Sequence, residues 1–284
     1  MCVRIAINMD IFVTLTERNR PVLLAELAAT RLASSILAER VLRAPTGMTR
    51  QMTDRLSIAM MKFIFDVEMP MLAKVPEFLR RTDFHNPEGA TTGALQFVER
   101  TDKVIWDWIP EHPDYMESCN TFMEGDRGSR SSWLKWFPVQ ERLFDGACTE
   151  GDDAVLMVDD LLRILEESTV DATRIEKFAF DLFKPQPIQG TSRIYYMKFI
   201  LHDWSDEDNQ RILRQLAGAM QAGYSKLIIE EFVLADRDCA MLQAIMERSQ
   251  AQWTRLLELA SFRVVKFWSP PGDGQGIIEA ELKE

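Results

Sequence analysis

The segment Tyr195–Leu213, YYMKFILHDWSDEDNQRIL, decides the fold of this chain. It begins inside an apolar run, Ile194–Leu201, whose β-branched and aromatic residues predict a buried strand. The polar triplet His202, Asp203 and Trp204 follows the end of that strand. A chemically versatile imidazole is therefore expected directly beyond a strand terminus.

A helix and a second strand are predicted after this triplet. Ser205, with Asp208 three residues later, favours a capped helix N-terminus, and Lys226–Leu234 (KLIIEEFVL) predicts the next strand. A strand–loop–helix–strand unit implies a parallel pair of strands. Because ligands bind beyond the carboxyl ends of strands in such sheets, His202 is expected at the functional edge.

A histidine in this position also has ordinary structural uses, such as capping or packing. Its neighbours favour a catalytic role, since the strand–HDW–S–D–E stretch closely resembles the signature of the plant- and fungal-type S-adenosylmethionine-dependent small-molecule O-methyltransferases. The resemblance implies that His202 is the general base that takes the proton from the acceptor hydroxyl.

The resemblance also implies the fold class. It predicts an α/β protein with a Rossmann-like, mainly parallel sheet catalytic domain, preceded by an all-α, winged-helix-derived N-terminal domain that would support a homodimer. We expect a helical N-terminal domain over 1–94, a helical connector lining the pocket over 95–150 and the methyltransferase domain over 151–284. The segment after Arg43 passes directly to APTGMTRQMT, so the recognition helix and β-wing of the family are absent.

Composition excludes several classes of partner. The formal net charge of −11 disfavours nucleic acid and anionic membrane surfaces. No apolar run reaches the roughly 18 residues of a membrane-spanning helix, and the N-terminus lacks a signal-peptide pattern. Four scattered cysteines without CxxC spacing, and only three histidines, predict reduced thiols in a cytoplasmic protein and no metal site.

The region between Asp54 and Arg142 is predicted to be helical, with a loop marked by Asn86-Pro87. It is rich in Met and aromatic residues, from Met60 to Trp136. These side chains could line a pocket for a flat apolar acceptor, or they could simply fill the core. Residues 122–143 resemble the family's connector into its catalytic domain, which favours some of them facing the cleft.

The cofactor half of the expected site departs from the family. Ala154–Asp159 predicts the first strand, but no glycine occurs between Gly151 and Gly190, where a glycine-rich turn should approach S-adenosylmethionine. The second strand, with its ribose-binding acid, is also expected to be missing, since only residues 168–174 fill the space. A further strand is predicted over Phe178–Phe183. We therefore expect weak S-adenosylmethionine binding.

Three positions match the family's cofactor contacts. The resemblance assigns Asp181 and Leu182 to the adenine and Lys198 to the cofactor side. As alternatives, Asp181 could cap a turn and Lys198 could extend its ammonium group from the strand into solvent. The glycines of GDGQG (272–276) do not replace the missing turn, because they lie between two strand-like segments and predict a hairpin.

Two glutamates complete the expected catalytic group. The resemblance assigns them to Glu231 on the strand predicted over Lys226–Leu234 and to Glu247 in MERSQAQW, flanking the base His202. A carboxylate on one ring nitrogen would fix the tautomer and leave the other nitrogen free to accept a proton. Glu230 points to the opposite face of its strand and is predicted to be a solvated surface carboxylate.

Three functions remain compatible with this pattern. The first is an O-methyltransferase of secondary metabolism that acts on an aromatic or polyketide-like hydroxyl. The second is a non-methylating relative that uses His202 for a cyclisation, dehydration or pericyclic step. The third is a non-catalytic scaffold subunit or an incompletely spliced gene product. The resemblance favours methyl transfer, and the sequence does not name the acceptor.

Overall fold

The computed structural model describes residues 2–22, 26, 46–85, 89, 91–129, 132–146, 156–160, 175–236, 247–272 and 274–283. These residues form two units, 1–130 and 131–284, and each unit is described by itself. The sequence also predicts one helix that begins at Pro21 and another that Ser34 or Ser35 caps. Most of these two helices lies outside the described residues, as does the segment 161–174. No described helix is both long and apolar enough to cross a membrane.

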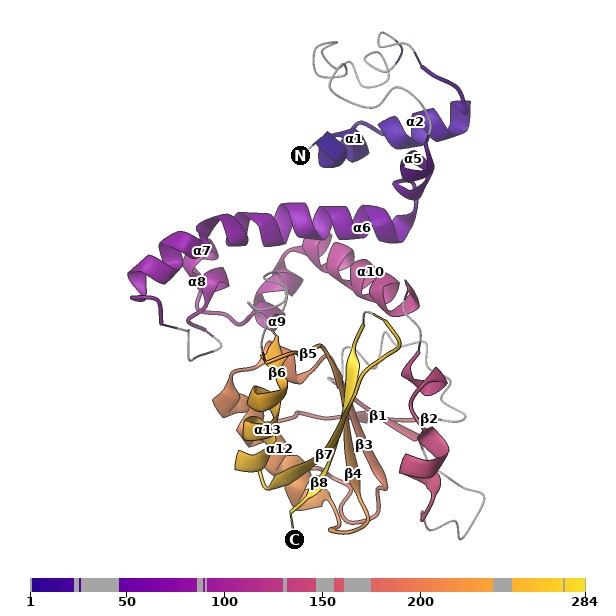
Figure 1. Ribbon diagram of the computed structural model, residues 1–284. Helices are drawn as coiled ribbons and strands as arrows, with labels where there is room; N and C mark the ends of the chain where they lie inside the picture. Colours follow the sequence, from indigo (N-terminus) through magenta and orange to yellow (C-terminus); the bar gives the residue numbers. More distant parts are fainter. Residues whose placement is uncertain are drawn as a thin grey trace. The chain divides into compact units, whose positions relative to one another are not determined.

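The described part of the first unit is helical (Figure 1). Its elements are α1 (Cys2–Asn8), α2 (Ile11–Arg18), α5 (Gly47–Gln51), α6 (Arg55–Phe63), the π-helix η1 (Ile64–Glu68), α7 (Met69–Arg81), α8 (Ala94–Glu99), α9 (Ile105–Trp108), the 3-10 helix η2 (Ile109–Glu111) and α10 (Pro113–Ser129). Asp54 caps α6 by accepting the Ser57 N–H at 3.0 Å. The helical prediction for this region is confirmed.

Aromatic and apolar side chains in this unit form two buried clusters. Phe63, Trp108, Ile109 and Cys119 are buried in one of them, so these side chains fill a core. The second cluster holds α1, α2 and α5 together around Phe12.

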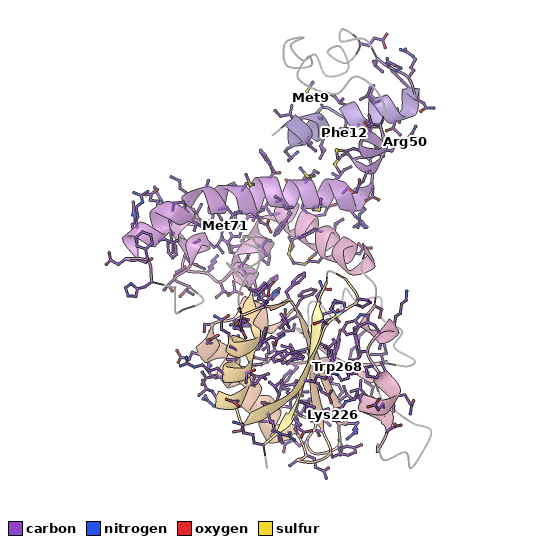
Figure 2. All side chains as sticks on the ribbon, in the orientation of Figure 1. Met9, Phe12, Arg50, Met71, Lys226 and Trp268 are labelled. Atoms are coloured by element: carbon purple, nitrogen blue, oxygen red, sulfur yellow. The ribbon has the colours of Figure 1, made fainter. Side chains whose placement is uncertain are left out.

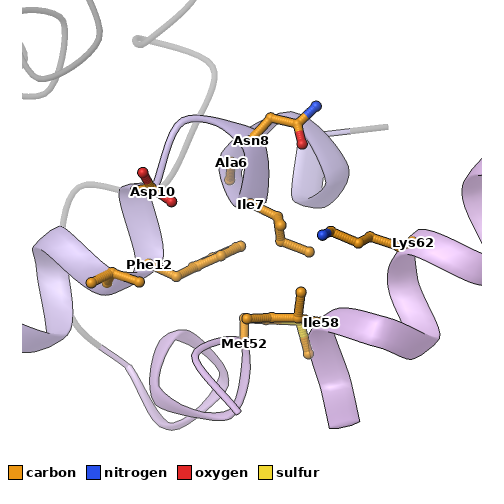
Figure 3. A pocket seen from close by; sticks show the side chains of 9 residues that line it. Ala6, Ile7, Asn8, Asp10, Phe12, Met52, Ile58 and Lys62 are labelled. Carbon is orange, nitrogen blue, oxygen red and sulfur yellow. The ribbon is translucent and has the colours of Figure 1, made fainter. Parts of the chain in front are cut away.

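A groove of about 350 Å³ opens beside this second cluster (Figure 3). Phe12, Met52 and Ile58 supply apolar surface to it, and Lys62 reaches it with its ammonium group. The groove belongs to the first unit, whereas the residues predicted to be catalytic belong to the second.

The second unit is built on a mixed sheet with the strand order β3-β4-β8-β7. Its elements are η3 (Trp133–Lys135), the π-helix η4 (Gln140–Phe144), β1 (Leu156–Asp160), β2 (Ile175–Ala179), β3 (Ile194–Lys198), the 3-10 helix η5 (Leu201–Asp203), α12 (Asp206–Ala219), β4 (Lys226–Glu231), β5 (Val233–Leu234), β6 (Arg248–Ser249), α13 (Gln250–Leu259), β7 (Phe262–Trp268) and β8 (Gly276–Leu282).

Strand directions follow the predicted topology at the centre of the sheet. β3 and β4 are parallel and joined through α12, as predicted from Tyr195–Leu213. β1 pairs in parallel with β2, and the short β5 with β6. The predicted hairpin is also confirmed, since β7 and β8 are antiparallel and β8 pairs with β4. The parallel strands are therefore extended by an antiparallel hairpin.

The two faces of the sheet are covered differently (Figure 1). α12 and α13 pack on one face, where Leu213, Leu227, Trp253 and Phe262 are fully buried. The segment 133–144 covers the other face, where Phe137 packs in a cluster with Ile228 of β4 and Ile277 of β8. Figure 2 shows Trp268 and Lys226 among the side chains of this layer.

The strand predicted over Phe178–Phe183 is wrong in its position. β2 covers Ile175–Ala179 instead, and Asp181 lies in the turn that follows. The reason is local, because the Asp181 carboxylate accepts the Phe183 N–H at 2.9 Å. Aspartate favours this kind of turn by bonding to the backbone two residues on.

Candidate active site

A bend at the end of β3 places His202. Phe199 adopts a left-handed backbone conformation with φ of 50°, which costs a residue with a Cβ about 1–2 kcal/mol. The bend is held by β4, since the Phe199 N–H bonds to the Glu230 carbonyl at 3.2 Å and the Ile200 N–H to Glu231 Oε1 at 3.1 Å. The chain then enters η5, which carries His202.

The helix after the bend begins as the sequence predicted. Ser205 Oγ accepts the Asp208 N–H at 3.1 Å and caps α12. Three acidic residues in the first turn suit the positive end of the helix dipole. The buried face of α12, with Ile212, Leu213 and Leu216, anchors it to the sheet, so the His202 turn has a rigid support on both sides.

Both predicted glutamates lie beside the imidazole. His202 Nδ1 is 3.7 Å from Glu231 Oε2 and 3.7 Å from Glu247 Oε1. Glu231 is fully buried at the end of β4, and Glu247 precedes β6. Chain segments separated by 45 residues in the sequence thus converge on one ring nitrogen. The structure brings His202, Glu231 and Glu247 together, as the sequence predicted.

A third carboxylate approaches the other ring nitrogen. Asp203 Oδ1 lies 3.4 Å from His202 Nε2, and burial raises the pKa of Asp203 to about 6. No role was predicted for Asp203, although it belongs to the HDW triplet. Its place immediately after the predicted base was the signal that could have found it.

Charge in this cluster is strongly coupled. Burial alone would lower the pKa of His202, but Glu247, Glu231 and Asp203 outweigh it and raise this pKa to about 9. Burial raises the pKa of Glu231 to about 7, although the His202 charge opposes this shift. The imidazole is thus a strong base that carries a proton at neutral pH in the absence of substrate.

The buried carboxylates keep unused hydrogen-bonding capacity. Glu231 Oε2 and Glu247 Oε2 are buried and have no hydrogen-bond partner. His202, Glu231 and Glu247 each offer one atom that could ligate a metal, and these three atoms lie within 4.8 Å of one another, close enough to bind one cation. A protonated imidazole already supplies positive charge between the two glutamates, so we assign acid–base chemistry to the cluster.

The prediction for Glu230 is wrong. This side chain is only 5% exposed, and Lys198 Nζ donates to its Oε1 at 2.9 Å. The Tyr196 hydroxyl donates to its other oxygen, and Tyr196 stacks on Trp133. Sequence alternation correctly placed Glu230 on the face opposite Glu231, but segment 133–144 covers that face and removes it from solvent.

The residues expected around the cofactor fit it only in part. Asp181 is exposed beyond the carboxyl end of β2, with Leu182 half-buried beside it, so both remain accessible to an adenine. Lys198 is bound to Glu230 and does not extend freely into solvent. β1 ends at Asp160 without the glycine turn. Asp181 and Leu182 are thus accessible beyond β2, while the glycine-rich turn is missing from the sequence.

Comparison with known proteins agrees with this geometry. Residues 155–263 match the O-methyltransferase domain. The chain is 30% identical to O-methyltransferase asqD of Emericella nidulans, in an alignment that covers 98% of this chain and 85% of the relative. The chain belongs to the O-methyltransferase family. The alignment with asqD extends over 330 positions, more than the 284 residues of this family member, so the relative has internal segments that are missing here.

Solved structures show that this O-methyltransferase family member keeps the fold. A LepI complex with S-adenosylmethionine is 19% identical, with a TM-score of 0.85 over 99% of this chain and 85% of LepI. A structure described as a pericyclic reaction enzyme gives the same TM-score and identity, covering 99% of this chain and 86% of the other. At this level of identity the likeness establishes the fold, which is α/β with a helical N-terminal region.

Proposed function

We propose that this family member transfers a methyl group to the hydroxyl of a small aromatic or polyketide-like secondary metabolite, with His202 as the general base. The observation that carries the proposal is the convergence of Glu231 and Glu247 on His202 Nδ1, at 3.7 Å each. An imidazole held through one nitrogen presents the other to a substrate. Such a base contributes on the order of 10²–10⁴ in rate.

The proton path follows from the distances. Glu231 and Glu247 stabilise the Nδ1–H tautomer, so Nε2 is the atom that accepts the hydroxyl proton. The resulting imidazolium is stabilised by the same two carboxylates and by Asp203 near Nε2. Burial of these groups strengthens their mutual attraction, because water screens them less.

S-Adenosylmethionine, when bound, supplies the electrophilic methyl group. Asp181 and Leu182 would hold the adenine, since they follow the carboxyl end of β2. This strand pairs in parallel with β1. Lys198, fixed by Glu230, would place a positive charge on the cofactor side. With no glycine between Gly151 and Gly190, we propose that the cofactor binds weakly.

One observation favours a second function. The acid–base cluster is complete, whereas the glycine-rich cofactor turn is absent. A chain that kept only the former could use His202 for a cyclisation, dehydration or pericyclic step. Such a step would act on a single substrate molecule, and no methyl group would be consumed.

The test uses methyl-labelled S-adenosylmethionine and a panel of phenolic and polyketide-like acceptors. The native chain should give a methylated product, and His202→Ala should lower its rate at least about a hundredfold with native-like circular dichroism. His85→Ala is the matched control, because His85 is exposed and belongs to the first unit. Full methylation by His202→Ala would remove His202 from the mechanism. Conversion of an acceptor to a product that does not carry the labelled methyl group would favour the second function.

A further inference from the structure

We infer that Arg248 is a positioning residue, which locks the turn that carries His202 against the segment that carries Glu247. The inference rests on the proposed function, since it concerns the same catalytic cluster. Arg248 directly follows Glu247 in the chain, and its side chain is 14% exposed. It therefore connects the two sides of the His202–Glu247 contact without touching the imidazole.

The guanidinium group of Arg248 hydrogen-bonds to the turn that carries His202. Arg248 Nη1 donates to the Leu201 carbonyl at 3.0 Å, and Nη2 donates to the Trp204 carbonyl at 3.0 Å. These two carbonyls flank His202 and Asp203 on either side. The third nitrogen, Nε, donates to Asp206 Oδ1 at 3.0 Å, and Nη2 lies 2.9 Å from the same oxygen. A planar guanidinium suits these contacts, because its rigid fork of N–H donors fixes the direction of each hydrogen bond as well as its length.

A second side chain holds the same two carbonyls. Asn209 Nδ2 donates to Leu201 O at 2.7 Å and to Trp204 O at 3.0 Å. Asn209 is fully buried on α12. Since each carbonyl already has this partner, the carbonyls would not be left unpaired by loss of Arg248. The added function of Arg248 is to tie them to the Glu247 segment.

The backbone and side chain of Arg248 are themselves held in place. Its backbone belongs to β6, where it pairs with Val233 of β5, two residues after Glu231. Its guanidinium carbon lies 5.2 Å from the centre of the buried Trp253 ring, in a cation–π contact. Glu231 thus lies two residues before β5 and Glu247 one residue before β6, so the short β5–β6 ladder holds the two glutamate segments together, and Arg248 links this ladder to the turn that carries His202.

Charge and position predict opposite effects on His202. The charged groups around the imidazole are Asp203 in η5, Glu231 in β4, Glu247 before β6, Arg248 in β6 and Asp206 at the start of α12. If Arg248 acted only through its charge, its removal would raise the pKa of His202, because a neighbouring positive charge disfavours the imidazolium. If it acts by position, its removal loosens the Glu247 contact and lowers that pKa.

The experiment measures the His202 ring protons by NMR titration of the full chain. Three histidines give few signals, and His202→Gln identifies the one that matters. Arg248→Lys keeps the charge and loses the fork, and Arg248→Gln loses both. We expect both variants to lower the His202 pKa by at least about one pH unit. We also expect turnover measured above pH 9, where His202 is neutral in the native chain and in both variants, to fall on the order of tenfold to a hundredfold, with KM little changed.

Arg263→Lys is the matched control, because Arg263 is exposed and pairs with Glu281 at the surface. It should leave both readouts unchanged. A purely structural role for Arg248 would lower the melting temperature and leave the His202 pKa in place, which would overturn the inference. So would a rise of this pKa in Arg248→Gln with no change in Arg248→Lys. The titration needs no turnover, so failure of the methyl-transfer proposal would be seen separately, in His202→Ala.

Discussion

His202 and Glu231 face each other across the carboxyl ends of two parallel strands, with 3.7 Å between Nδ1 and Oε2. Their alignment depends on the left-handed Phe199, which turns the chain so that the Ile200 N–H binds the other oxygen of Glu231. One oxygen of this buried carboxylate therefore fixes the backbone, and the other faces the imidazole. This division explains why a fully buried glutamate is useful there.

The first prediction concerns the pH dependence of turnover. With a His202 pKa of about 9, only on the order of one imidazole in a hundred is neutral at pH 7. If His202 is the base, kcat/KM should rise about tenfold per pH unit from pH 7 and level off near pH 9. A profile that is already flat at pH 7 would contradict this assignment.

The second prediction separates the effect of Glu247 from that of an ordinary surface charge. Glu247→Gln removes the side chain that most strongly holds the proton on His202, so the rising limb of the profile should move to lower pH. Glu258→Gln is the control, because Glu258 is an exposed residue of α13. Steady-state kinetics from pH 5 to 10 would check this. Identical profiles for the two variants would remove Glu247 from the cluster.

The third prediction concerns stability against pH. The folded-state pKa of His202 is raised from 6.5 to about 9, so its contribution is complete below pH 6.5 and is lost as pH rises through 9. The pKa of Glu231 is raised from 4.5 to about 7, so the folded state also binds this proton more tightly. Both effects make the free energy of unfolding fall between about pH 5 and 9.

Denaturant titrations at pH 5, 7 and 9 would measure this slope. The His202→Gln variant should have a flatter dependence than the native chain over the upper half of the range, since its side chain does not titrate. An equal slope in both proteins would show that the imidazole gains no proton affinity on folding.

The fourth prediction concerns the buried carboxylate that attaches segment 133–144 to the sheet. Glu279 is fully buried and accepts from Arg142 Nη2 at 2.7 Å, from Lys226 at 3.1 Å and from the Trp268 indole at 3.1 Å. Burial alone would raise the pKa of Glu279, but Arg142 and Lys226 outweigh it and lower the pKa. Its contribution is therefore present above pH 4.5 and is lost in acid.

Glu279→Gln should lower the free energy of unfolding by about 3 kcal/mol, because it leaves two cations without their carboxylate. Arg263→Gln, which breaks an exposed pair on the neighbouring strand β7, should cost at most about 1 kcal/mol. Urea denaturation at pH 7 compares them. Equal losses in the two variants would mean that burial adds nothing to the Glu279 network.

The catalytic half of the site could be predicted because its signals are local. A strand ending in HDW, a Ser205 cap and an alternating strand with Glu231 fix side-chain direction over a few residues. Glu247 was found through the family pattern, and its distance to His202 depends on the β5–β6 pairing that no local pattern predicts. The grip of Arg248 on distant carbonyls has the same non-local origin.

Errors arose where tertiary contacts decide the outcome. Glu230 alternates correctly along β4, but its burial depends on segment 133–144, which precedes it by about ninety residues and covers its face. The displacement of the strand predicted over Phe178–Phe183 has a different cause, since the turn chemistry of Asp181 ended a run that periodicity alone would have continued. Hydrophobic pattern thus located the elements, and polar side chains set their ends.

The fifth prediction tests the central claim, that a complete acid–base cluster is combined with a weakened cofactor site. Without the glycine turn and a second-strand acid, each unmade buried hydrogen bond costs about 1–3 kcal/mol. Two or three such losses weaken binding by a few powers of ten. Titration calorimetry of the full chain with S-adenosylmethionine should therefore give a Kd in the high-micromolar range or weaker. A low-micromolar Kd would contradict the claim.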